Sequence, residues 1–79
     1  MIKLQNIHRD KGSIICDAFV EDCTKPVSLS LNEQTKELGE FTLPNNYEYC
    51  KSHIMHAKKY LKSLIGKEFK NHEKMIMWY

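Results

Sequence analysis

Hydrophobic and polar residues alternate along several short stretches of the chain, and a period of two is typical of β-strands. The clearest stretch is 27–31, where Val27, Leu29 and Leu31 point one way and two serines point the other. This pattern predicts a strand with one buried side and one solvent-facing side. Apolar patterning predicts five strands in all: 2–8, 14–20, 27–31, 37–43 and 75–79.

The first strand carries an irregularity. Ile7 falls out of phase with Ile2 and Leu4, which indicates a β-bulge or a strand covered on both sides. The following residues, 9–12, predict a turn in which Gly12 takes the positive φ of a bulged hairpin. We therefore expect the first two strands to form an antiparallel pair.

The second and fourth predicted strands leave alternatives open. Residues 14–20 carry apolar side chains on both faces, which favours an inner strand. Gly39 lies within 37–43 and indicates another bulge. The alternative for this region is a one-turn helix over 33–38, capped by Asn32 and stopped by Gly39.

A helical period appears after Pro44. Apolar residues at steps of four and three form one stripe: Cys50, Ile54, Ala57, Leu61 and Leu64. Asn45 or Asn46 is a suitable N-cap, and Gly66 is a suitable C-terminal stop. The sequence therefore predicts a helix over 47–65, roughly 28 Å long at a rise of about 1.5 Å per residue.

The order β-β-β-β-α-β predicts a single α+β domain over 1–79. One mainly antiparallel sheet, covered on one face by one helix, is the simplest way to bury these stripes. The other face would then expose Ile15 and Phe19, together with either Met75 and Met77 or Ile76 and Trp78. Such an apolar patch predicts a dimer or a partner protein.

The charge is unevenly distributed. The formal net charge is +2, with −3 in residues 1–50 and +5 in residues 51–79. This dipolar distribution could steer an acidic partner or support head-to-tail self-association. Arg9 is the sole arginine, which argues against specific reading of nucleic-acid bases.

The expected location is the cytoplasm. No uncharged apolar run approaches the roughly 18 residues that a membrane span requires, and no signal peptide is recognisable. Cys16, Cys23 and Cys50 are an odd number without a CxxC pair. They indicate reduced thiols, with Cys16 and Cys50 as small core residues.

The two flanks of the predicted helix carry different chemistry. Tyr49, His53, His56 and Tyr60 follow one flank and could form a ligand-binding wall, a pH-sensitive contact or an ordinary core boundary. The other flank carries Lys51, Lys58, Lys59 and Lys62. These lysines could attract phosphates without regard to sequence, or simply solvate the helix.

Cys50, His53 and His56 also raise the alternative of a metal site. Three ligands at steps of three spread over about 120° of a helix, and a structural zinc site needs a fourth ligand that the spacing does not supply. A nucleophilic pair of Cys16 or Cys50 with His53 is the catalytic alternative. No phosphate-binding, nucleophile-elbow or metalloprotease motif is present. We therefore expect no cofactor, no bound metal and no enzymatic activity.

Three features together suggest a family: residues 16–19 (Cys-Asp-Ala-Phe), the helical steps of four from Tyr49 through His53 to Ala57, and the ending Met77-Trp78-Tyr79. Through them the chain resembles a group of short uncharacterised bacterial proteins that end in Met-Trp-Tyr. Lys36 departs from that group, in which glycine is usual at this position. The resemblance implies a bacterial, cytoplasmic protein and supplies no activity or site residue.

These observations favour a small accessory protein that acts through contact with a protein partner or with itself. The expected interaction residues are Phe19, Tyr49, His53, His56, Tyr60 and Trp78, with Phe19, Tyr60 and Trp78 as anchors. One alternative is a sequence-blind nucleic-acid binder that uses Lys51, Lys58, Lys59 and Lys62. A second alternative is a small Cys/His metal protein or enzyme.

Overall fold

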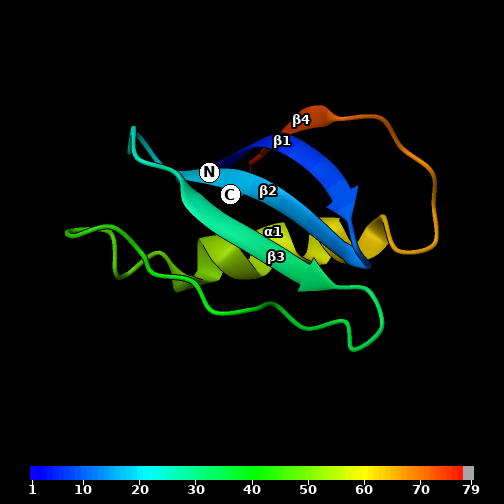
Figure 1. The fold of residues 1–79 in the computed structure, drawn as a ribbon. Coiled ribbons are helices and arrows are strands. Elements are labelled where there is room, and N and C mark those ends of the chain that lie inside the picture. The colour runs from blue at the N-terminus through cyan, green and yellow to red at the C-terminus, as the bar shows by residue number, and fades with distance from the viewer. Residues whose placement is uncertain (78–79) are drawn as a thin grey trace.

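The computed structural model describes residues 1–77. Its elements follow the order β1 (Ile2–Asp10), β2 (Ser13–Val20), β3 (Val27–Asn32), α1 (Lys51–Ser63) and β4 (His72–Ile76). The strands form one antiparallel sheet in the spatial order β3-β2-β1-β4, and α1 crosses one of its faces (Figure 1). The α+β prediction is confirmed, although residues 1–77 contain four strands where five were expected.

The irregularity in β1 is a β-bulge. Of the two predicted explanations, a bulge or a strand covered on both sides, the first is confirmed. The register between β1 and β2 shifts between Gln5 and His8. Asn6 lies at the bulge with a φ of 55°, a left-handed conformation that asparagine tolerates better than most residues. The extra residue returns Ile7 to the buried face, which explains why Ile7 falls out of phase in the sequence.

The hairpin between β1 and β2 confirms the positive φ predicted for Gly12, but it is a two-residue turn without the predicted bulge, since Asp10 pairs directly with Ser13. Lys11 and Gly12 connect the strands with positive φ values of 49° and 81°. Two consecutive left-handed residues match the twist of a tight hairpin, and glycine adopts this conformation without steric cost. The turn thus aligns β1 and β2, which form the centre of the sheet.

The predicted strand over 37–43 is wrong, and so is the alternative helix over 33–38. Asn32 instead organises a turn, because its side-chain oxygen accepts hydrogen bonds from the backbone N–H groups of Gln34 and Thr35. A single bridge then pairs Leu38 with Leu31. Leu38 and Leu43 pack against the core from irregular backbone, so their burial does not require a strand.

The helix is shorter than predicted at its N-terminus. Residues 44–50 form two successive turns, closed by hydrogen bonds from Tyr47 N to Pro44 O and from Cys50 N to Tyr47 O. Neither predicted cap, Asn45 or Asn46, adjoins the helix, because α1 begins only at Lys51. Asn46 instead takes a left-handed conformation with a φ of 72° in the first of these turns. Buried Cys50 occupies the N-cap position without a side-chain hydrogen bond. Gly66 follows the end of α1 with a φ of 76°, as its predicted role as a stop requires.

The last strand begins earlier than predicted. β4 pairs with β1 from His72 opposite Ile7 to Ile76 opposite Ile2. The sequence predicts no strand in the polar first half of β4, but strands at a sheet edge commonly carry charged side chains. The predicted final residues, Trp78 and Tyr79, lie outside the described residues.

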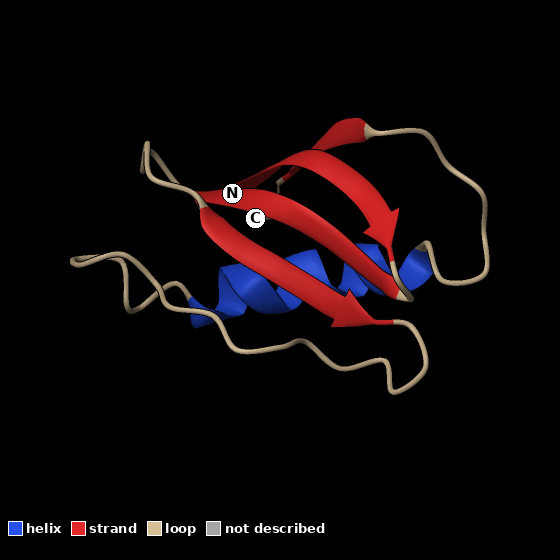
Figure 2. Cartoon of the chain, in the orientation of Figure 1, coloured by secondary structure: helices blue, strands red, loops and turns tan. Residues whose placement is uncertain are grey.

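The core lies between α1 and the face of the sheet that α1 covers (Figure 2). Every third or fourth residue of α1 contributes to it, together with alternate residues of β1, β2 and β3. Each fully buried Ile or Leu contributes roughly 1.5–3 kcal/mol. The fully buried large side chains are Ile2, Leu4, Ile7, Ile14, Leu29, Leu31, Ile54 and Leu61.

A polar clamp holds the end of α1 to the sheet. Arg9 of β1 forms two hydrogen bonds with Glu33, at 2.5 Å from Nε and 3.0 Å from a terminal guanidinium nitrogen. The same arginine donates to the carbonyl of Leu64 at 3.2 Å, and its guanidinium lies 5.0 Å from the ring centroid of Phe69. Paired hydrogen bonds of this kind fix geometry as well as charge. The clamp therefore joins β1, the turn after β3 and the segment after α1.

Candidate functional site

The sheet has one face that α1 leaves uncovered, and we call it the open face. Its central positions are the alternate residues of β1 and β2 whose side chains point away from the core, together with Met75 of β4: Lys3, Gln5, Ile15, Asp17, Phe19 and Met75. No helix or strand covers this face within residues 1–77. It is therefore the natural place to look for a binding surface.

The open face is more polar than the sequence suggested. Ile15, Phe19 and Met75 are present as expected, but Lys3, Gln5 and Asp17 stand among them, because they belong to the same alternation. Ser28 and Ser30 of β3 extend the polar part. Of the two predicted pairs of C-terminal residues, the one containing Met75 applies, since Ile76 packs against the core. The expected continuous apolar patch is thus reduced to a smaller cluster.

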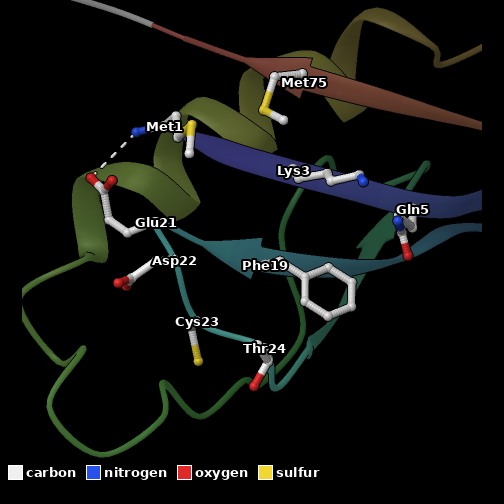
Figure 3. Close-up of a pocket in the computed structure, with 9 residues that line it drawn as sticks. All are labelled: Met1, Lys3, Gln5, Phe19, Glu21, Asp22, Cys23, Thr24 and Met75. Atoms are coloured by element: carbon white, nitrogen blue, oxygen red, sulfur yellow. Dashed lines mark hydrogen bonds and ion pairs between the residues drawn. The ribbon is translucent and has the colours of Figure 1, made fainter.

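Phe19 and Met75 of this cluster border a hollow of about 430 Å³ (Figure 3). Phe19 stands opposite Lys3, and Lys3 stands opposite Met75, so three adjacent strands place these side chains in one row. Met75 is 47% exposed and Met1, beside it, is 44% exposed. The hollow is lined by Met1, Lys3, Gln5, Phe19, Glu21, Asp22, Cys23, Thr24 and Met75.

A network of charges fixes one rim of the hollow. The Glu21 carboxylate accepts hydrogen bonds from the N-terminal ammonium at 3.3 Å and from His53 Nε2 at 2.5 Å. Its φ of 50° turns the chain sharply at the end of β2. The hydrogen bond from His53, followed by that from the N-terminal ammonium, lowers the pKa of Glu21. The carboxylate therefore remains charged and ties the rim to α1.

A second contact holds the next part of the rim. Tyr47 donates a hydrogen bond to Asp22 at 2.7 Å, and the ring of Tyr49 stacks on Tyr47 at a centroid distance of 6.4 Å. The hydrogen bond to the Asp22 carboxylate raises the pKa of Tyr47 to about 12. The segment before α1 is thereby attached to the loop between β2 and β3. Sequence reasoning missed both rim contacts, because each joins residues more than 20 positions apart.

The predicted Tyr/His flank does not form one wall. His53 is 8% exposed and reaches Glu21, whereas Tyr49 is 70% exposed and belongs to the tyrosine stack. Tyr60 donates a hydrogen bond to His72 Nε2 at 2.8 Å, since His72 Nδ1 donates to the carbonyl of Lys70. His56 is half-buried. Of the three predicted anchors, Phe19 lies on the open face, Tyr60 packs against β4, and Trp78 lies outside the described residues.

The predicted lysine flank remains together. Lys58, Lys59 and Lys62 surround a hollow of about 230 Å³ with Met55, and Lys51 stands at the start of the same helix. Lys51, Lys59 and Lys62 are exposed, while Lys58 is half-buried. The structure thus brings Lys58, Lys59 and Lys62 together, with Lys51 about two helical turns away on α1.

The cysteines and histidines do not assemble a site. Within residues 1–77, no three side chains of His, Cys, Asp or Glu come together in a way that could hold a metal ion. Burial raises the pKa of Cys16 to about 12 and also raises the pKa of Cys50. Neither thiol is therefore activated as a thiolate near neutral pH.

Comparison of the chain with protein-family models, with curated proteins and with solved structures gave no match. Among the described residues, the only helix is α1, and it is neither long nor apolar enough to cross a membrane.

Proposed function

We propose that the protein is a contact module that pairs with a second copy of itself through the open face. The observation that carries this proposal is the row of Phe19, Lys3 and Met75 around an uncovered hollow of about 430 Å³. Phenylalanine and methionine are enriched in the cores of protein interfaces. The function requires no cofactor, and a partner would bury side chains that α1 cannot reach.

Charge on the open face favours a second copy as the partner. Lys3 and Asp17 lie on this face on adjacent strands, offset by two residues, because Asp17 pairs with Gln5. Neither side chain forms an ion pair within residues 1–77. A two-fold axis that lies in the plane of the face and passes between these two residues would place Lys3 of each copy against Asp17 of the other, which makes the interface complementary to itself. The same pairing would cover Phe19 and Met75.

The proposed location is the cytoplasm. Cys16, Cys23 and Cys50 are all free thiols. Disulfides persist mainly in oxidising compartments, so three unpaired cysteines are compatible with a reducing one. This location would keep the thiol of Cys23, which lines the hollow, reduced.

Sedimentation equilibrium between about 1 μM and 1 mM tests self-association over the range of weak to moderate affinities. We expect a dimer whose dissociation constant rises about tenfold or more in Phe19→Ala, because buried aromatic anchors dominate interface energies. Phe41→Ala is the matched control, since it removes an exposed phenylalanine ring that does not line the hollow. A monomer at every concentration overturns the proposal.

Charge reversal sharpens the test. Lys3→Asp and Asp17→Lys should each weaken the dimer, whereas the double variant should recover much of the lost affinity, since it exchanges the two signs. Equal weakening in all three variants would contradict the two-fold arrangement. Circular dichroism on each variant verifies that the fold is retained.

A further inference from the structure

The helix α1 is basic along its whole length. Its thirteen residues include four lysines and no aspartate or glutamate. These lysines, which we call the lysine stripe, are Lys51, Lys58, Lys59 and Lys62. None of their side chains forms an ion pair within residues 1–77, so their charge is available to a partner.

The stripe is a coherent surface and not a scatter of charges. Lys58 and Lys62 are one helical turn apart, which separates them by roughly 6 Å along the axis. Together with Lys59 and the 56% exposed Met55 they border the hollow of about 230 Å³. From Lys51 to Lys62 the stripe extends about 16 Å, given a rise of about 1.5 Å per residue.

We propose that the lysine stripe binds the phosphodiester backbone of nucleic acid without reading its base sequence. A row of ammonium groups without interspersed carboxylates suits a polymer that carries one negative charge at each repeat. Lysine acts as a point charge and lacks the planar fork with which arginine recognises guanine. The sole arginine, Arg9, is already engaged by Glu33 and Leu64, so it is not available for base recognition.

The same surface fits a membrane less well. A helix that lies in a lipid interface needs a broad apolar face that can enter the acyl boundary. In α1 that face is already buried against the sheet through Ile54, Ala57 and Leu61. Met55 is the one large apolar side chain exposed on α1, so phosphodiester is the favoured anion.

This proposal is independent of the dimer proposed above. The apolar face of α1 covers the side of the sheet opposite the open face, so the stripe is not part of that surface. A dimer formed through the open face would leave both stripes accessible and would double the number of contacts on a long nucleic acid. A monomer would still bind, but with lower avidity.

Fluorescence polarisation of the full chain with a labelled single-stranded oligonucleotide and a labelled duplex tests the proposal. With up to four phosphate contacts, we expect the association constant for the single strand to fall about 50-fold between 50 and 200 mM salt. The double variant K58E/K62E should weaken binding about tenfold or more at the lower salt concentration. Oligonucleotides of different sequence should bind within about threefold of one another.

The matched control is K25E/K67E, which changes the net charge by the same amount at two exposed lysines outside α1. We expect it to weaken binding by less than about threefold. Equal losses in the two double variants would overturn the proposal, because they would indicate diffuse attraction to the net charge. Absence of binding to both nucleic acids would also overturn it, as would binding only to vesicles of phosphatidylcholine and phosphatidylserine.

Folding and dimerisation are controlled separately. If circular dichroism shows that K58E/K62E is unfolded, the neutral variant K58Q/K62Q replaces it, with an expected loss of about fivefold. Phe19→Ala should bind a short oligonucleotide as tightly as the unaltered protein does. An unaltered protein that stays monomeric yet binds the oligonucleotide would therefore remove the open-face proposal and leave this one standing.

Discussion

The two faces of the sheet are formed by the same strands but differ in burial and in polarity. Leu4 and Ala18 pair on the covered face and are fully buried, whereas their neighbours Gln5 and Asp17 pair on the open face. The covered face is apolar across the centre of the sheet and is closed by α1, while Arg9, His72 and Lys74 lie at its margins. The open face combines both charges with exposed apolar groups. The comparison teaches that one face determines the fold, while the other is available for contact.

The largest expected difference between the two faces is in the free energy of unfolding, when neighbouring side chains of β1 are truncated to alanine. Leu4→Ala should lower the free energy of unfolding by about 2–5 kcal/mol, because it leaves a cavity beneath α1. Gln5→Ala, on the open face of the same strand, should change the free energy of unfolding by less than about 0.5 kcal/mol. Urea unfolding followed by circular dichroism measures both values. Similar losses in the two variants would contradict the distinction between the faces.

The labelling rates of the three cysteines compare the two faces without a substitution in the core. Cys16 and Cys50 belong to the covered side and are buried, while Cys23 at the rim of the open face is half-exposed. A thiol-specific reagent at neutral pH should label Cys23 at least about 100-fold faster than the other two, which need local or global opening. Mass spectrometry of labelled peptides identifies each site, with Cys23→Ser as the control. Fast labelling of Cys16 would mean that the covered face opens readily.

The features that the sequence predicts well are local ones. The alternation of Val27, Leu29 and Leu31, the bulge that shifts Ile7 and the left-handed Gly12 depend on neighbours within a few positions. Period and turn chemistry therefore suffice to place them. The confirmed fold class follows from the same local signals combined with the burial of one helix stripe.

The features that it misses depend on contacts between distant residues. The clamp of Arg9 with Glu33 and the contact of His53 with Glu21 join positions 24 and 32 apart, so no local pattern signals them. The prediction of a strand over 37–43 is wrong for a related reason. Leu38 and Leu43 pack against the core although the backbone that carries them is irregular. For the candidate site, the alternation places Phe19 correctly on the open face. The Tyr/His flank is divided because His53 contacts Glu21 and Tyr60 contacts His72, whereas Tyr49 stacks on its near neighbour Tyr47.

Acid should weaken the polar contacts at both ends of the molecule. The pKa of Glu33 is lowered chiefly by the hydrogen bond from Arg9, and the pKa of Glu21 chiefly by that from His53. A lowered pKa in the folded state means that the carboxylate stabilises the fold above the ordinary glutamate value of about 4.5, and that this contribution is lost as the pH falls through the lower folded value. The free energy of unfolding should therefore decrease with falling pH in this range.

Two substitutions divide this acid effect between the clamp and the rim. Glu33→Gln should flatten the pH dependence by removing the clamp, and Glu21→Gln should flatten it by removing the rim contact. Glu40→Gln is the control, since Glu40 is exposed and forms no ion pair within residues 1–77. Thermal unfolding at several pH values measures each slope. A slope in Glu33→Gln equal to that of Glu40→Gln would contradict a stabilising clamp.

The smallest expected effect concerns Tyr47, whose hydrogen bond to Asp22 holds the segment before α1 against the rim of the open face. Because this contact raises the pKa of Tyr47 to about 12, it stabilises the fold fully below the ordinary tyrosine value of about 10 and is lost as the pH rises through the folded value. Asp22→Asn should shift the titration of Tyr47 toward that ordinary value, as measured by tyrosinate absorbance, with Tyr47→Phe identifying the signal. An unchanged titration in Asp22→Asn would mean that this contact does not hold the segment before α1 against the rim.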